Sequence, residues 1–426
     1  MSHSARHCCA LSTFVSLIGI CLAAEPAQSP AGIRKFDFGS QKTSPGWTAV
    51  TASDAYDPAK GYGFEDFGSQ QDSNAAGDPL LGDSITSSVG ACFSVTLPEG
   101  TYRVKATLGD AAKSADTTIK AEARKLMIES AKTLTGEHQV REFSVNIRTP
   151  KLADGKCVAI APQEAKLLQW DDKLTIEWLG PHASVAALEI APEPAAPVVW
   201  LLGDSTVTDQ DYEPWNSWGQ MLTRFFKPGI AVANHARSGA SIRSSLSSRR
   251  VQKVLDGVKP GDFVCIQFGH NDMKDRRPTA LDEYRANLVT LARDIQSKGG
   301  QTILITSMER KAGVQKLTLA GYPDAVRSVA KELNLPCIDL QNTSLELYRA
   351  LGSQLNSAFV DGTHHNSYGS YLLARCVTLG IRDQVPTLAK WLTPDAFPFD
   401  PSSPATPATF SVPASSRIDP TKPEGN

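Results

Sequence analysis

Two patterns of apolar and polar residues divide the chain. From about residue 36 to residue 190, short runs alternate apolar and polar positions and are separated by turn residues. Such alternation is typical of half-buried strands, and a series of short strands predicts a β-sandwich. We expect residues 93–97 and 102–108 to form a hairpin across Pro98-Glu99-Gly100. Further alternating runs lie at 117–123, 141–147 and 173–178.

The pattern changes after residue 197. Continuous apolar runs predict buried strands at 198–202, 262–268 and 302–306, and apolar residues at helical spacing between them predict helices. Shorter strands are expected at 230–233 and 337–340, and helices at 281–295, 322–333 and 367–379. Strands that alternate with helices form a mostly parallel sheet with helices on both faces.

These patterns predict the domain boundaries. A length of 426 residues favours two domains over one. A β-sandwich domain is expected at 32–191, a stiff proline-rich linker at 192–197, and an α/β domain at 198–393. Residues 394–426 are rich in proline, serine and threonine, and we expect a disordered tail there.

The amino terminus has the composition of a secretory signal. Arg6 precedes an apolar run at residues 11–22, which ends in Ala23-Ala24. The run is too short to span a bilayer comfortably, so we interpret residues 1–24 as a cleaved signal peptide rather than a membrane anchor. A lipid anchor on Cys21 is a further alternative. The protein is expected to be secreted or periplasmic, with no membrane attachment after cleavage.

Charge and cysteine content exclude several classes of protein. The 43 Lys and Arg residues nearly balance the 45 Asp and Glu residues, so the totals indicate no nucleic-acid partner. Five of the eight cysteines lie beyond residue 24, with no Cys-x-x-Cys pair. An odd number in an exported protein excludes complete pairing within one chain. We expect neither a disulfide framework nor a zinc site.

The run at 198–202 stops abruptly at Gly203-Asp204-Ser205-Thr206. A glycine directly after a buried strand permits a tight turn, and the following hydroxyl would lie where open α/β sheets place their sites. Our hypothesis is that Ser205 is a nucleophile, and the alternative is an ordinary turn. Gly82-Asp83-Ser84 repeats the tripeptide without a buried strand before it, and we interpret that copy as a loop.

Later motifs supply the other groups that acyl transfer needs. His364 can take the proton of Ser205, and Asp361, three residues earlier, can orient the imidazole and fix its tautomer. The backbone amide of Gly239, the side-chain amide of Asn271 and the backbone amide of Ser205 can form an oxyanion hole. Each motif falls at a predicted strand end or loop of one α/β domain, which favours a shared site.

Each of these residues also has a structural interpretation. Gly239 is a turn glycine in isolation, and Asn271 and Asp361 are also typical helix caps, with His364 then a surface residue. Taken one residue at a time, however, these structural interpretations do not explain why all the motifs lie in one domain. His270 is a candidate for substrate contact, although a structural hydrogen bond is its favoured interpretation.

Aromatic and amide residues follow the nucleophile loop. Trp215, Asn216 and Trp218, together with Tyr212, can line a sugar site by apolar stacking. The alternative is that one or more of them belong to the core. We therefore predict substrate contacts for Trp215, Asn216, Trp218 and His270, with the core as the competing location.

At this point the motifs resemble the ordered blocks of a known superfamily. Gly203-Asp204-Ser205, Gly239, Gly269-x-Asn271-Asp272 and Asp361-x-x-His364 resemble the SGNH (GDSL-type) hydrolases. More narrowly, Gly-Asp-Ser-Thr, Asn-x-Ala, Gly-His-Asn-Asp and Asp-x-Thr-His-x-Asn resemble rhamnogalacturonan acetylesterases. The β segment, with Phe36-Asp37-Phe38-Gly39, resembles the galactose-binding-like module of bacterial members.

The resemblance implies a fold and a set of roles. The fold is a three-layer α/β/α flavodoxin-like hydrolase domain, preceded by an all-β galactose-binding-like sandwich. The activity is that of a monomeric serine esterase without metal or other cofactor. One block departs from the family, because Ser238-Gly239-Ala240-Ser241 stands where members often have Gly-Gly-Arg-Ser. Arg237 and Arg243 are both candidates for the missing arginine.

The expected function is that of an exported esterase with acetylated plant cell-wall polysaccharide as its partner. It would remove O-acetyl groups from pectic polysaccharide, in the manner of a rhamnogalacturonan acetylesterase, through an acyl-enzyme on Ser205. One alternative keeps this chemistry on another acetylated glycan, such as xylan, or on a lipid ester. An alternative of another class is a non-catalytic carbohydrate-binding protein.

Overall fold

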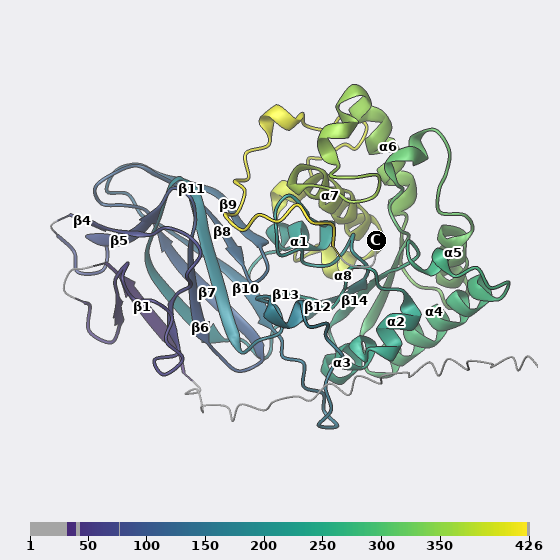
Figure 1. Cartoon of the computed structure of the whole chain (residues 1–426), viewed down its shortest axis with the longest axis horizontal. Helices are drawn as coiled ribbons and strands as arrows, with labels where there is room; N and C mark the ends of the chain where they lie inside the picture. Colours follow the sequence, from purple (N-terminus) through teal and green to yellow (C-terminus); the bar gives the residue numbers. More distant parts are fainter. Residues whose placement is uncertain (1–31, 40–42, 76, 424–426) are drawn as a thin grey trace, which may run out of the picture.

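The computed structural model describes residues 32–39, 43–75 and 77–423. The predicted signal peptide at 1–24 lies outside the described residues. None of the helices in the described part combines the length and the apolar composition that a membrane span requires. Figure 1 shows two parts side by side, a strand-rich part that we call the β part and a mixed part that we call the α/β part.

The β part is a sandwich of two sheets that share one long strand. Its strands are β1 (Arg34–Phe38), β2 (Thr48–Val50), β3 (Tyr62–Phe64), β4 (Gln71–Asn74), β5 (Asp83–Ser87), β6 (Ala91–Thr96), β7 (Gly100–Leu108), β8 (Ala115–Ala121), β9 (Lys125–Thr133), β10 (Gln139–Ile147) and β11 (Lys173–Pro192). The first half of β11 pairs with β6 and β8, and its second half pairs with β1, β5 and β7. Side chains from both sheets, such as Phe93 and Val104, meet in a single apolar core.

The predicted hairpin between β6 and β7 was wrong. Strand β6 pairs with β3 and β11, whereas β7 pairs with β10 and β11 in the other sheet. Both strands bury alternate side chains, Val95 and Val104 among them, in the same core. Two strands that cover one core from opposite sides cannot also be neighbours, so Pro98-Glu99-Gly100 crosses between the sheets.

The first Gly-Asp-Ser copy also differs from its prediction as a loop. Asp83 and Ser84 begin β5 and are buried. The Oγ atom of Ser84 lies 2.9 Å from that of Ser184 on β11, within hydrogen-bond distance. This short strand was missed because its side chains are mostly polar, and their hydrogen-bond partners lie in other segments of the sandwich.

The α/β part contains a parallel sheet in the order β13-β12-β14-β15-β16. Its strands are β12 (Val198–Gly203), β13 (Ala231–Asn234), β14 (Phe263–Gln267), β15 (Gln301–Ile305) and β16 (Cys337–Ile338). Numbered along the chain, this is the order 2-1-3-4-5 of flavodoxin-like sheets. The switch in strand order falls beside β12, so the residues after Gly203 lie where such sheets bind ligands.

Helices cover both faces of this sheet. They are α1 (Trp218–Leu222), α2 (Ile242–Ser247), α3 (Arg250–Gly257), α4 (Ala280–Ser297), α5 (Tyr322–Leu333), α6 (Leu340–Leu351), α7 (Ser367–Gln384) and α8 (Pro386–Ala389). Val199 and Leu201 of β12 belong to the core that contains α1, α6 and α7, whereas Trp200 and Leu202 belong to the core that contains α3, α4 and α5. The alternation along one strand produces the three predicted layers. Short 3-10 helices are η1 (Glu164–Lys166), η2 (Thr223–Phe225), η3 (Asp272–Lys274), η4 (Lys311–Val314), η5 (Gly352–Ala358), η6 (Pro394–Ala396) and η7 (Pro407–Thr409).

The segment expected as a linker at 192–197 is held against the β part. Strand β11 continues to Pro192, and the Glu193 amide donates to the Thr101 carbonyl at 2.7 Å. The Glu193 carboxylate also accepts hydrogen bonds from Arg103 and from Ser144, whose Oγ lies 2.6 Å away. The prolines favour an extended backbone here, as predicted for a stiff linker. The contacts of Glu193 fix this segment to the β part, so it does not act as a free linker between the two parts.

The segment expected as a disordered tail is ordered through residue 423. Figure 1 shows its yellow trace reaching toward β8 and β9 before it turns back over the α/β part. Lys120 of β8 donates to the Pro413 carbonyl at 2.8 Å, and Ser415 is buried and donates to Glu177 at 2.6 Å. The proline-rich composition predicted disorder, but partners elsewhere in the chain bind this segment and hold it in place.

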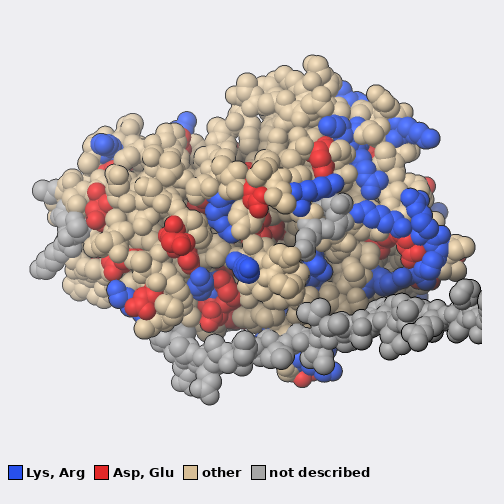
Figure 2. Space-filling view, viewed as in Figure 1, with Lys and Arg blue, Asp and Glu red and all other residues tan. Residues whose placement is uncertain are grey.

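Charged side chains of both signs cover the surface. On the face in Figure 2, Lys and Arg are most frequent over the α/β part on the right, with Asp and Glu among them. Some form networks: Arg277 and Arg243 each bond to Asp275 and Glu283. Such pairing agrees with the nearly balanced total charge.

The cysteines depart from prediction at one position. Cys157 is disulfide-bonded, although the sequence predicted no disulfide framework. The other described cysteines, Cys92, Cys265, Cys337 and Cys376, are free. Burial raises the pKa of the Cys265 thiol to about 12, which keeps it protonated and unreactive.

Candidate active site

The turn after β12 is shaped by close packing around Gly203. A Cβ atom on Gly203 would lie 2.6 Å from a methyl group of Val207 and 2.8 Å from the Gln267 carbonyl oxygen. A glycine is needed at this position because there is no room for a side chain, and not because the backbone is left-handed. The turn returns the chain against its own strand and leaves Ser205, 2% exposed, at the carboxyl end of the sheet.

Three predicted residues form one hydrogen-bonded line. The Oγ atom of Ser205 lies 2.9 Å from Nε2 of His364, and Nδ1 of His364 lies 2.9 Å from Oδ2 of Asp361. The residues come from β12 and from the loop before α7, 159 positions apart between Ser205 and His364. Since a carboxylate only accepts, Nδ1 carries the proton and Nε2 faces the hydroxyl as an acceptor.

The Asp361 carboxylate is held in its charged form. Its other oxygen, Oδ1, accepts hydrogen bonds from the backbone amides of Thr363 and His364, each at 2.7 Å. Partial burial alone would raise the pKa of Asp361, but hydrogen bonds from the His364 side chain and from the two amides outweigh it and hold the pKa well below its usual range. A fixed negative charge therefore faces the imidazole. Lys422 of the C-terminal segment lies 3.5 Å from the same Oδ2.

The two predicted oxyanion donors lie at one turn. Gly239 has a φ of +74°, a left-handed value that favours glycine. The hydrogen bond of this turn runs from the Ala240 amide to the Arg237 carbonyl at 3.1 Å, and the Gly239 amide takes no part in it. The side-chain amide of Asn271 donates to the Ala240 carbonyl at 3.1 Å and does not cap η3. Gly239 and Asn271 thus face the same region of the site.

Asp204 and His270 stabilise the turn that carries the nucleophile. Oδ1 of Asp204 accepts from the amide and the hydroxyl of Thr206 at 2.9 and 2.8 Å. Its Oδ2 lies 3.4 Å from Nδ1 of His270, whose Nε2 lies 3.0 Å from the Met308 carbonyl oxygen. Both ring nitrogens of His270 face groups of the protein interior, which favours its structural interpretation over a contact with substrate.

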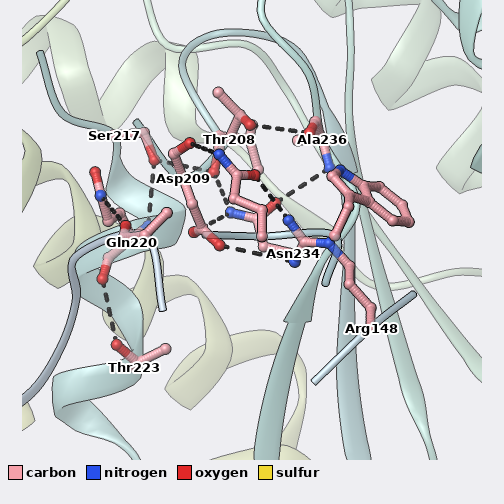
Figure 3. Close-up of polar contacts among 12 residues, drawn as sticks. Arg148, Thr208, Asp209, Ser217, Gln220, Thr223, Asn234 and Ala236 are labelled. Carbon is pink, nitrogen blue, oxygen red and sulfur yellow. Dashed lines mark hydrogen bonds and ion pairs between the residues drawn. The ribbon is translucent and has the colours of Figure 1, made fainter. Parts of the chain in front are cut away.

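The loop after Ser205 is fixed by side chains from two elements. Gln210 donates to the Ser205 carbonyl at 2.8 Å. Asn234, at the end of β13, donates to the Val207 carbonyl at 2.6 Å. It also donates to Asp209 Oδ1 at 2.8 Å, and Figure 3 shows these two side chains facing each other. The loop therefore has little freedom to displace the serine.

Only part of the predicted aromatic site reaches a cavity. Trp215 lines it and packs edge-on against His364, with ring centroids 5.6 Å apart. Trp218 is buried in the core, where its indole donates to Gln267 at 2.8 Å. Asn216 is also buried; its backbone amide donates to the His365 carbonyl, and its side-chain oxygen accepts from the Ser217 amide at 2.9 Å. The predicted substrate contacts of Trp218 and Asn216 were therefore wrong, because polar groups of the interior occupy both side chains.

The cavity beside the triad has a volume of about 210 Å³. Three segments line it: the loop before β11, the nucleophile loop with the Gly239 turn, and the C-terminal segment. Its lining includes Leu167, Gln169, Asp209, Asp211, Tyr212, Trp215, Arg237, Asp419 and Lys422. Sequence patterns missed Gln169 and Lys422, because each is far from the motifs in the chain.

The two candidate arginines separate clearly. Arg237 lines the cavity beside the triad, and its Nε lies 3.8 Å from Glu164. Arg243 is exposed and bonds to Asp275 and Glu283, and it lines a second pocket together with Asn271. Arg237 thus adjoins the cavity beside the triad and Arg243 adjoins the pocket on the Asn271 side, so both stay candidates for the missing arginine.

Comparison with known proteins gives two family matches and several relatives. Residues 34–156 match the Beta-agarase/YXIM esterase-like, galactose-binding domain-like family, and residues 201–371 match the GDSL-like Lipase/Acylhydrolase family. Rhamnogalacturonan acetylesterase RhgT of Bacillus subtilis (strain 168) is 34% identical over 207 residues, which cover 43% of this chain and 89% of that protein. The uncharacterized esterase YxiM of the same organism is 28% identical over 403 residues, which cover 88% of this chain and 97% of that protein. The crystal structure of the YxiM protein from Bacillus subtilis matches with a TM-score of 0.43 at 25% identity, over 83% of this chain and 98% of that one.

Proposed function

The chain belongs to the GDSL-like lipase/acylhydrolase family, and on this premise we propose that it is an exported esterase that removes O-acetyl groups from pectic polysaccharide. It is a carbohydrate acetylesterase, and its catalytic residues are Ser205, His364 and Asp361. The observation that carries the mechanism is the line of two 2.9 Å hydrogen bonds from Ser205 through His364 to Asp361.

The reaction has two halves. Oγ of Ser205 attacks the acetyl carbonyl carbon while Nε2 of His364 takes the hydroxyl proton. The tetrahedral intermediate then collapses, the sugar hydroxyl leaves with the proton from His364, and the acetyl group stays on Ser205. Water, deprotonated by the same imidazole, attacks the acetyl-serine and releases acetate. Throughout, the Asp361 carboxylate stabilises the imidazolium form and its orientation.

The negative charge that develops on the carbonyl oxygen is stabilised by fixed donors. The proposed donors to this oxygen are the backbone amides of Ser205 and Gly239 and the side-chain amide of Asn271. Because the turn and Asn271 are bonded to each other through the Ala240 carbonyl, little reorganisation is needed when the charge appears.

Replacement of Asn271 by alanine tests the oxyanion role. We expect kcat for an aryl acetate to fall by about 10²- to 10³-fold with little change in KM, since the lost bond is made mainly in the transition state. Steady-state kinetics on the purified chain measures both constants. Asn342→Ala, on exposed α6 surface, serves as the control and should leave both unchanged. A kcat for Asn271→Ala within a few-fold of the parent's would remove Asn271 from the oxyanion hole.

The pectic substrate is supported by the relatives. RhgT, which is 34% identical over 207 residues, is named a rhamnogalacturonan acetylesterase. Export is supported by the signal-like sequence at residues 1–24. A polysaccharide is too large to enter the cell, so an enzyme that acts on it has to work outside.

A panel of acetylated polymers tests the substrate. We expect acetate release from acetylated rhamnogalacturonan to exceed release from acetylated xylan, and release from both to disappear in Ser205→Ala. Aryl esters of increasing chain length separate acetylesterase from lipase activity. Preference for xylan, or for long acyl chains, would replace the pectic assignment. A chain that binds the polymers but releases no acetate from any ester would be a non-catalytic carbohydrate-binding protein.

A further inference from the structure

An acidic side chain of the cavity beside the triad has an unused oxygen. Asp211 lines this cavity and is 7% exposed. Its Oδ2 accepts a hydrogen bond from Gln169 at 2.6 Å, while its Oδ1 is buried without a hydrogen-bond partner among the described residues. A buried acceptor without a partner costs free energy, so a group of this kind at a cavity wall points to a ligand that donates to it.

The β part holds Asp211 in position. Gln169 lies just before β11, and its amide nitrogen donates both to Asp211 and to the Asp209 carbonyl, the latter at 3.1 Å. The oxygen of Gln169 accepts from Arg148 at 2.9 Å. The guanidinium of Arg148 stacks on Trp170 and lies 3.8 Å from the Asp209 carboxylate, and Figure 3 shows it reaching in from the β part. A chain of polar contacts thus joins the two parts at the cavity.

The cavity is next to the reacting atoms. Gln210, the neighbour of Asp211, donates to the Ser205 carbonyl, and Trp215 connects the cavity wall to the His364 ring. A group bound at Asp211 therefore lies close to an ester bound at Ser205. Both residues belong to the same loop, which Asn234 and Gln210 hold by hydrogen bonds.

The lining favours a neutral sugar. Leu167, Tyr212 and Trp215 offer apolar surface, which suits the faces of a sugar ring. Carboxylates accept hydrogen bonds from hydroxyl groups, and both Asp209 and Asp211 face the cavity. Arg237 and Lys422 also line the cavity, so charge alone does not select between a neutral and an anionic ring. The neutral ring is favoured because the Asp211 oxygen that has no partner in the described part of the chain suits a hydroxyl donor.

We propose that this cavity is a sugar subsite in which Asp211 accepts hydrogen bonds from hydroxyl groups of a neutral ring next to the acetylated one, with Gln169 of the β part as its positioning residue. This inference rests on the proposed glycan esterase function. The galactose-binding-like part then acts as one wall of the catalytic cleft, rather than as a separate sugar-binding module.

Kinetics of Asp211→Asn separates glycan binding from chemistry. Asparagine keeps the size of the side chain and can still accept from Gln169, but it places an NH₂ donor where Asp211 has its second acceptor oxygen. We expect KM for acetylated oligosaccharides to rise by about 10-fold or more, while kcat/KM for an aryl acetate changes by less than about twofold. Asp383→Asn, an exposed aspartate at the end of α7, is the matched control and should change neither. The unfolding temperature of Asp211→Asn should not fall below that of the parent.

Binding without turnover makes the test independent of the esterase assignment. The full chain carrying Ser205→Ala, with and without Asp211→Asn, is titrated calorimetrically with neutral and with uronate-containing oligosaccharides free of acetyl groups. We expect the neutral ones to bind and the Asp211→Asn change to weaken them by about 10-fold. Failure of every neutral oligosaccharide to bind, or equal binding by both proteins, would overturn the subsite. Loss of aryl-acetate activity in Asp211→Asn alone would instead make Asp211 a structural residue.

Discussion

Replacement of Ser205 by alanine lowers kcat for an aryl acetate by on the order of 10⁶-fold, and replacement of His364 by alanine has an effect of similar size. The two residues act as one unit, because the hydroxyl is reactive only when the imidazole 2.9 Å away takes its proton. The double variant Ser205→Ala/His364→Ala should therefore lose no more than a few-fold beyond either single variant. Kinetics with high enzyme concentration, after removal of contaminating parent protein, measures the residual rate.

The chain provides its own control for this prediction. Ser84 belongs to a second Gly-Asp-Ser tripeptide, at the start of β5 in the β part, and bonds to Ser184. Ser84→Ala should keep the parent's kcat and KM for the aryl acetate. If Ser205→Ala and His364→Ala multiplied their losses, or if Ser84→Ala matched Ser205→Ala, the proposed nucleophile and base would be wrong.

The chemistry of the site followed from short motifs because each catalytic residue lies at a strand end or in a loop. The strand before Ser205 is continuous and apolar, and the sheet order places its carboxyl end at the switch point. Asp361 and His364 are three residues apart, so one turn of chain suffices to bring them together. Gly239 and Asn271 required the sheet to be assembled, yet both follow strands that neighbour β12, and parallel strands end at the same edge.

Long-range packing explains what the sequence could not predict. The connection after β6 crosses to the opposite sheet, so that β6 and β7 cover the same core from two sides. The alternation of apolar and polar residues would be the same if the two strands formed a hairpin, so it could not distinguish the two arrangements. Trp218 and Trp215 have similar sequence surroundings, but one faces the core and the other the cavity. Gln169 and Lys422 reach the cavity from 40 or more positions away along the chain, as the contact of Gln169 with Asp209 illustrates. Composition cannot indicate which polar residue of a remote loop will meet a site.

The turn between β8 and β9 joins the two parts through a buried charge. Arg124 is almost fully buried, and its guanidinium donates to the carbonyls of Gln210 and Trp215 at 3.2 and 3.1 Å and pairs with Glu213. All three partners belong to the loop that follows the nucleophile. Lys120 lies 3.7 Å from the same carboxylate, and the Ser415 amide donates to it at 3.1 Å. Arg124 is therefore the central cation of an interior network that connects β part, nucleophile loop and C-terminal segment.

Replacement of Arg124 by methionine should lower the free energy of unfolding by about 3–5 kcal/mol, because it leaves the Glu213 carboxylate and two carbonyls buried with fewer partners. Urea denaturation of the full chain, followed by tryptophan fluorescence at a fixed pH, measures the loss. The double variant Arg124→Met/Glu213→Gln removes both charges and should recover part of it, giving a favourable coupling energy between the two sites. Arg243→Met, which removes an exposed arginine from a surface network, should cost no more than about 1 kcal/mol. If Arg124→Met cost as little as Arg243→Met, the ion pair with Glu213 would be incidental to the stability of the junction between the two parts.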